Sequence, residues 1–159
     1  MSARNVVRRE PVEVIEPRVP DRTLDRLSGV RKQRLERLER ERRDARAAWR
    51  RQRAALRLAK LLWRNARQAA TEHWQQARQQ FFAMETDSRQ FRAAQGGHER
   101  MKRDTGQRLL AWRENATASR AAGAEFFAAH RRLQNARKQQ EKLDLLREHI
   151  RAGARHHDD

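Results

Sequence analysis

The sequence predicts an all-α protein in which two long helices pack antiparallel as a coiled-coil hairpin with a flexible N-terminal tail. The main evidence is a seven-residue repeat, in which one heptad position is occupied by an apolar residue each time except at Arg42. Hydrophobic and charged residues each make up 37% of the chain, which suits a thin rod better than a thick core. The residues at this heptad position are Leu35, Arg42, Trp49, Leu56, Trp63, Ala70, Ala77, Met84 and Phe91.

Three regions are expected along the chain. Residues 1–22 contain all three prolines, which exclude a continuous helix, so we predict a disordered or extended tail. Residues 23–152 are predicted to form the helical hairpin. Residues 153–159 are predicted to be a frayed C-terminus, because untied chain ends are poorly ordered.

The hairpin turn is predicted near residues 95–98. Gly96 and Gly97 are the only adjacent glycines, and the first apolar series ends just before them. The first helix would then run from Val30 to Ala94 and the second from His98 to Ala152. Because the first helix would be the longer one, we expect it to overhang the second at the open end.

Reversal at the double glycine predicts a register in which opposed residue numbers add to about 193. Trp63 would then face His130, and Phe81 would face Trp112. In the second helix the gap between Leu133 and Leu143 predicts a local change of supercoil. The predicted seam consists of Trp49, Leu56, Trp63, Met84, Phe91, Leu109, Trp112, Phe126, Leu133 and Leu143.

Polar residues recur at the other core position of the first helix. Gln52, His73, Gln80 and Asp87 occupy it, and we expect them to weaken a continuous hairpin or to lie at its edges. Trp74, Phe81 and Phe82 lie beside the seam toward the turn. Packing across the hairpin and partner binding are equally expected for Trp74 and Phe81, whereas the outward position of Phe82 favours binding.

The net charge of +17 makes nucleic acid a candidate partner. Many cations are spaced four residues from an acid, however, so a solvated basic face is favoured and no specific nucleic acid is expected. The absence of cysteine excludes disulfides and thiol chemistry, and fits a cytoplasmic location. No segment is apolar enough to span a membrane.

We expect no enzyme activity and no cofactor, because no phosphate-binding loop, zinc motif or nucleophile motif is present. The histidines lie on the seam or at predicted helix ends, where a structural role is favoured. His156, His157, Asp158 and Asp159 could in principle bind a metal, but a chain end lacks the supporting shell of residues, so we predict no metal site.

The chain resembles the FliJ/YscO family of type III secretion stalk proteins in its length, its arginine-rich helical composition and the segment from Arg137 to His149. The resemblance implies a non-enzymatic stalk that couples a hexameric export ATPase to the membrane export gate. Secretion chaperones are a further implied contact. The implied location is the cytoplasm, at most peripheral to the inner membrane, and flagellar and injectisome systems remain equally open.

By this resemblance the open end of the hairpin enters the ATPase ring, while Trp74, Phe81 and Phe82 meet the gate. The residues expected to contact the ATPase are Arg31, Arg34, Leu35, Leu38, Arg42, Arg137, Lys138, Lys142 and Arg147.

Two other functions are open on the sequence alone. The first is a homo-oligomeric structural rod, in which the heptad seam pairs between chains and the double glycine is only a kink. The second is a basic coiled coil that binds nucleic acid, with phosphates held by Arg40, Arg43, Arg46, Arg50, Arg53 and Arg57.

Overall fold

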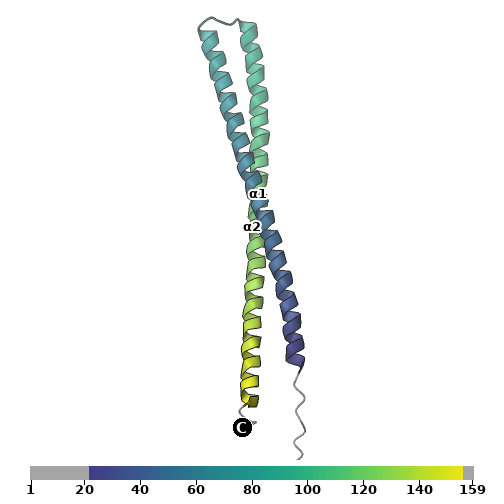
Figure 1. Ribbon diagram of the computed structural model, residues 1–159. Helices are drawn as coiled ribbons and strands as arrows, with labels where there is room; N and C mark the ends of the chain where they lie inside the picture. The colour runs from purple at the N-terminus through teal and green to yellow at the C-terminus, as the bar shows by residue number, and fades with distance from the viewer. Residues whose placement is uncertain (1–21, 156–159) are drawn as a thin grey trace, which may run out of the picture.

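The computed structural model describes residues 22–155, which form two long helices and no strand (Figure 1). Helix α1 covers Arg22–Phe82 and helix α2 covers Ser88–Arg155. At the usual rise per residue they are about 92 and 102 Å long. The helices run antiparallel and cross at a shallow angle in Figure 1, with the connection at one end and Arg22 and Arg155 at the other.

The prediction of an all-α fold with two long antiparallel helices is therefore confirmed. The predicted tail lies outside the described residues except for Arg22, which begins α1. Residues 153–155 were expected to fray but continue α2. The four residues that could bind a metal, 156–159, also lie outside the described part.

The hairpin turn occupies residues 83–87, so its predicted position near residues 95–98 is wrong. Met84 lies in the turn just after α1 and has a left-handed backbone conformation, with φ of 58°. Its amide donates to the carbonyl of Phe81 at 3.0 Å, and the amide of Glu85 donates to the carbonyl of Gln80 at 2.9 Å. This pattern is a Schellman C-cap, which satisfies carbonyls that the end of a helix leaves open.

Helix α2 begins with a reciprocal cap between Asp87 and Gln90. The amide of Gln90 donates to Oδ1 of Asp87 at 2.7 Å, and the amide of Asp87 donates to Oε1 of Gln90 at 3.0 Å. Such a capping box satisfies two of the donors that a helix start leaves unpaired. Together with the Schellman cap it reverses the chain about ten residues before the double glycine.

Gly96 and Gly97 are helical, which costs about 1 kcal/mol each relative to alanine but does not stop a helix between strong formers. A Cβ on Gly97 would lie only 3.3 Å from Nε2 of His73 on α1. Glycine at this position therefore lets the two helices approach closely and does not make a turn.

The shifted turn changes every pairing across the hairpin, whose residue numbers add to about 174 rather than 193. Trp63 stacks on Trp112 with ring centroids 4.9 Å apart, and Trp49 stacks on Phe126 at 5.3 Å. The predicted pairing of Trp63 with His130 is wrong, and His130 instead lies 6.1 Å from Phe126 of its own helix.

Most of the predicted seam faces the partner helix. The exception is Met84, which lies in the turn and is 92% exposed. The seam residues other than Met84 are half-buried or buried: Trp49, Leu56, Trp63, Phe91, Leu109, Trp112, Phe126, Leu133 and Leu143.

Three of the four polar residues of the other core position lie along the helix pair. Gln52, His73 and Gln80 are half-buried, whereas Asp87 is exposed in the turn, where it caps α2. Nε2 of His73 lies 3.1 Å from the carbonyl oxygen of Ala94, and Nδ1 of His98 lies 3.1 Å from that of Ala70. Each imidazole is thus hydrogen-bonded to the opposite helix, which removes most of the cost of burying it.

The best-buried part of the interface lies at the open end. Leu133 is completely buried and packs with Leu38 and Ala136. The buried series continues from Leu133 through Ala136 and Gln140 to Leu143. The amide of Gln140 donates to Oγ of Ser28 at 3.3 Å, which lets a polar side chain occupy a core position.

Within residues 22–155, neither helix includes a stretch long and apolar enough to cross a bilayer.

Candidate interaction surfaces

The open end of the hairpin is held together by hydrogen bonds and ion pairs between the helices. Arg137 donates to Glu39 at 2.8 Å, and Arg31 donates to the carbonyl of Gln139 at 2.9 Å. Arg147 forms a further ion pair with Asp25 of α1. Several cations that we expected to contact an ATPase are therefore partly engaged within the molecule.

The predicted overhang is wrong, because α2 is the longer helix and both arms extend to the open end. Leu35 packs on the buried cluster and Leu38 is 5% exposed, so neither forms an outer surface. Arg42 is half-buried as well. Of the predicted ATPase contacts, the exposed cations without an ion pair in the described chain are Arg34, Lys138 and Lys142.

The charge of Glu39 is stabilised by its partner on α2. The hydrogen bond from Arg137 lowers the pKa of the Glu39 carboxyl, and the charges of Arg137, Arg43 and Arg42 act in the same direction. This carboxylate therefore links the two helices across the open end.

Aromatic rings cluster at the closed end. Phe81 stacks on Phe91 at 4.4 Å, so its predicted packing on Trp112 is wrong. Trp74 stacks on His98 at 5.0 Å, which occupies one face of its ring. Phe82, in contrast, is 73% exposed, as its outward position in the sequence predicted. Of the three residues expected to contact an export gate, Phe82 is the one whose ring is largely free.

One side of α1 is a continuous row of exposed cations, which we call the cationic flank. Its members follow at alternating spacings of three and four residues, so they share one face. Between Ala45 and Thr71 the chain contains no acidic residue. The cationic flank comprises Arg43, Arg46, Arg50, Arg53, Arg57, Lys60, Arg64 and Arg67, all of them exposed.

This surface was not predicted as a single face. Part of the row was expected to form a basic surface together with Arg40, and the basic residues in general were expected to be mixed with acids. Assigning heptad positions along α1 identifies the row of cations, because its members occupy the two heptad positions on one side of the seam.

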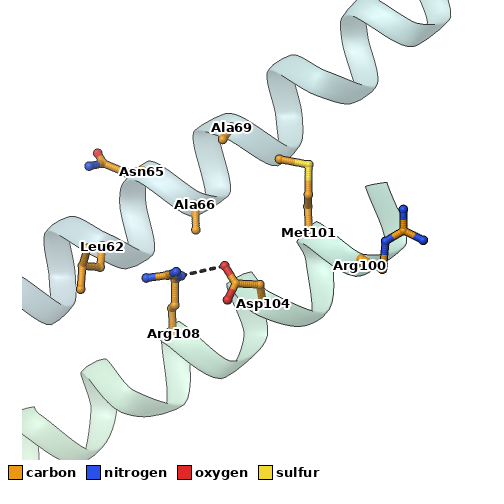
Figure 2. A pocket seen from close by; sticks show the side chains of 8 residues that line it. All are labelled: Leu62, Asn65, Ala66, Ala69, Arg100, Met101, Asp104 and Arg108. Carbon is orange, nitrogen blue, oxygen red and sulfur yellow. Dashed lines mark hydrogen bonds and ion pairs between the residues drawn. The ribbon is translucent and has the colours of Figure 1, made fainter. Parts of the chain in front are cut away.

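The opposite side of the seam is largely apolar apart from Arg51 and Asn65, and we call its apolar residues the apolar flank: Ala48, Ala55, Leu58, Leu62 and Ala69. Leu58 is 57% exposed and Leu62 is 42% exposed. Shallow grooves run between this flank and α2, and Figure 2 shows one of them, which contains an ion pair between Arg108 and Asp104 at 2.7 Å. The two sides of the rod thus differ in chemistry.

Among residues 22–155, no three histidine, aspartate or glutamate side chains are grouped so that they could hold a metal ion. No protein-family model, curated protein or solved structure matches the chain. The fold therefore defines the molecule only as a hairpin of two long antiparallel helices. The inference of its function depends on the surfaces described above.

Proposed function

We propose that this protein is a non-enzymatic stalk of a type III secretion apparatus, built as an antiparallel coiled coil. It couples a hexameric export ATPase to the membrane export gate, in the cytoplasm at the inner membrane. The observation that carries the proposal is the chemical difference between the two ends of one long rod. Both ends present exposed cations, and the closed end presents in addition an exposed aromatic ring, Phe82, which has no counterpart among the described residues of the open end.

The open end suits insertion into a ring because it is both stiff and basic. Cross-helix bonds of Arg137 and Arg31 hold the arms together, and Leu133 is fully buried between them. Arg34, Lys138 and Lys142 remain available to carboxylates of a channel wall. A two-helix rod cannot match sixfold symmetry, so it contacts the six subunits unequally and biases their nucleotide states.

The closed end suits contact with the gate. The rings of Phe81, Phe91 and Trp74 pack together and make a firm support. Phe82 projects from this support with 73% of its surface exposed, which is the geometry of an anchor residue at a protein interface. Secretion chaperones would be a further partner of the same rod.

The test is the ATPase rate of the hexameric export ATPase from the same genome, measured with increasing amounts of the purified chain. We expect the rate to rise and to saturate. The triple variant Arg34→Ala, Lys138→Ala, Lys142→Ala should need about tenfold more protein for the same rate, if each contact contributes about 0.5 kcal/mol.

The matched control replaces three exposed cations near the closed end, Arg89, Arg100 and Arg103, with alanine and should behave as the wild type. An unchanged ATPase rate at saturating wild-type protein would refute the stalk function.

The apolar flank favours a second candidate, a homo-oligomeric structural rod. Leu58 and Leu62 expose apolar surface that a second copy could cover. Light scattering combined with size-exclusion chromatography separates the candidates, because the rod requires a stable dimer or higher oligomer. Replacement of Leu58 and Leu62 by glutamine should then return the mass to that of one chain.

A further inference from the structure

The cationic flank has an unusual charge pattern for a surface helix. From Arg43 to Arg67 it extends about 36 Å, with a cation every three or four residues. Apart from the pair between Arg43 and Glu39, none of its members forms an ion pair within residues 22–155. Like charges at this spacing repel one another and destabilise the isolated helix, so an anionic partner would relieve the repulsion.

Aromatic rings of the seam hold several of these cations in place. The guanidinium of Arg53 lies 5.3 Å from the ring centroid of Trp49, and that of Arg67 lies 5.8 Å from Trp63. The ammonium of Lys60 lies 5.8 Å from the ring centroid of Trp112 on α2. These three cations are seven residues apart, which corresponds to about 10.5 Å along a helix.

Two grooves lie between the cationic flank and α2, with volumes of about 660 and 380 Å³. The larger contains Arg53, Arg57 and Arg120, and the smaller contains Arg67 and Lys102. No acidic residue lines either groove. Positive charge from both helices therefore surrounds each hollow.

Small residues make these hollows, and apolar atoms line them. Gly123 and Ser119 line the larger groove beside Phe127, which is 49% exposed. Gly106 leaves space in the smaller groove, where an added Cβ would meet nothing within 4 Å. The hollows can therefore receive apolar side chains from outside.

We propose that the cationic flank binds an acidic amphipathic helix of a partner protein, which lies along the rod as a third helix. Carboxylates repeated every seven residues meet Arg53, Lys60 and Arg67, and apolar side chains enter the two hollows. The proposal depends on this charge pattern and not on the stalk function.

A helix fits these observations better than a nucleic acid does. The row of cations is straight and has heptad spacing, as in a helix that lies parallel to α1, whereas phosphates wind around a duplex. Apolar hollows have no use in binding a phosphate backbone but are the usual receptors of helix side chains. Nucleic acid is therefore an alternative outcome of the test.

The probe is a fluorescent helical peptide of four heptads, with leucine at the two core positions and glutamate at the two flanking positions of each heptad. Fluorescence anisotropy at physiological salt should show binding. Replacement of Arg53, Lys60 and Arg67 by glutamine should weaken it about tenfold, at about 0.5 kcal/mol for each lost contact. Replacement of Arg89, Arg100 and Arg103 by glutamine keeps the same net charge and should leave binding within about twofold.

The variant Gly106→Leu tests the hollow, because the structure has room for the side chain and the variant keeps every charge. It should weaken peptide binding about tenfold and leave binding of a 25-base-pair duplex unchanged. The matched control is Gly96→Leu, which also has free space around its Cβ but does not line either groove. Thermal unfolding verifies that each variant is folded.

Three results would overturn the proposal: no binding of the peptide, equal weakening by both sets of cation replacements, or wild-type affinity of Gly106→Leu. Tighter binding of the duplex than of the peptide would assign the flank to nucleic acid instead. Since no ATPase is present, these outcomes are independent of the ATPase stimulation that tests the stalk.

Discussion

Trp63 of α1 and Trp112 of α2 stack across the hairpin with their ring planes inclined by only 15°. Their centroids are 4.9 Å apart, so the rings meet over a broad area about a third of the way from the turn to the open end. Offset stacking of this kind contributes about 1 kcal/mol beyond burial. The pair therefore helps to set the register along the whole interface.

The first prediction concerns this tryptophan pair. Trp63→Ala should lower the free energy of unfolding by about 3 kcal/mol, because it removes a large side chain and leaves a cavity against Trp112. A double-mutant cycle with Trp112→Ala should give a coupling of about 1 kcal/mol. Denaturant unfolding measures both. The exposed Leu61 is the control, and Leu61→Ala should change stability by less than about 0.5 kcal/mol.

The second prediction separates the turn observed here from one at the double glycine. Gly96→Ala should raise the free energy of unfolding by about 1 kcal/mol, because Gly96 is helical and nothing lies within 4 Å of its added Cβ. In a turn with positive φ the same change would be destabilising.

Gly123→Ala provides the contrast at a close approach between the helices. Its Cβ would lie 3.1 Å from Nε1 of Trp49, and the indole would have to move. We therefore expect a loss of about 1–3 kcal/mol in place of a gain. Thermal and denaturant unfolding of the two alanine variants measure the difference.

The third prediction concerns the cap of α2. Asp87→Ala should cost about 1 kcal/mol of stability, because the amide of Gln90 loses the acceptor that it now reaches at 2.7 Å. Glu85→Ala is the control in the same turn, since its carboxylate forms no hydrogen bond or ion pair within residues 22–155. An equal effect of the two substitutions on the denaturation midpoint would argue against the cap.

The fourth prediction is a pH dependence at Glu39. Its pKa is lowered in the folded protein, so the contribution of its carboxylate is fully present above the ordinary value of 4.5. The contribution disappears as the pH falls through the lowered pKa, since the protonated group no longer accepts from Arg137 as an anion. Glu39→Gln should thus reduce the melting temperature at about pH 7 but scarcely at about pH 2.

The matched control for this titration is Glu36→Gln on the same helix, whose carboxylate forms no ion pair within residues 22–155. It should give nearly the same melting temperature as the wild type at both pH values. A difference between wild type and Glu39→Gln that persists in acid would show that the pair acts through packing and not through charge.

The heptad of apolar residues was enough to predict two long helices and most of the seam. Trp49, Trp63, Trp112 and Phe126 all face the partner helix, because a repeat of seven places them on one side. What the repeat does not contain is the axial position of one helix along the other. That position depends on where the chain turns.

The turn could not be placed by glycine alone. Adjacent glycines such as Gly96 and Gly97 commonly end a helix. The stronger indication of the turn was the spacing of Asp87 and Gln90, which form a capping box at the start of α2. The Schellman cap before it has a methionine in the left-handed position where glycine is usual, so its sequence signal is weak. The error in the turn then displaced every predicted pairing, including that of Phe81.

The predicted contact sites were affected in the same way. Leu35 and Leu38 were expected on an overhang, but the longer α2 covers them. Phe82 was predicted correctly as outward, because its position relative to the seam depends on the repeat within α1 and not on the turn. Features local to one helix were therefore more predictable than features that need both.

The start of α1 and the end of α2 lie at the same end of the rod, opposite the turn at residues 83–87. A rod that a partner holds at this end acts as a lever, so a small change in its angle moves the turn by a large distance. A tilt of about 10° over about 92 Å would carry the loop sideways by roughly 16 Å. Modest rearrangements at one extremity would thus become large displacements at the other, without any bending of the shaft.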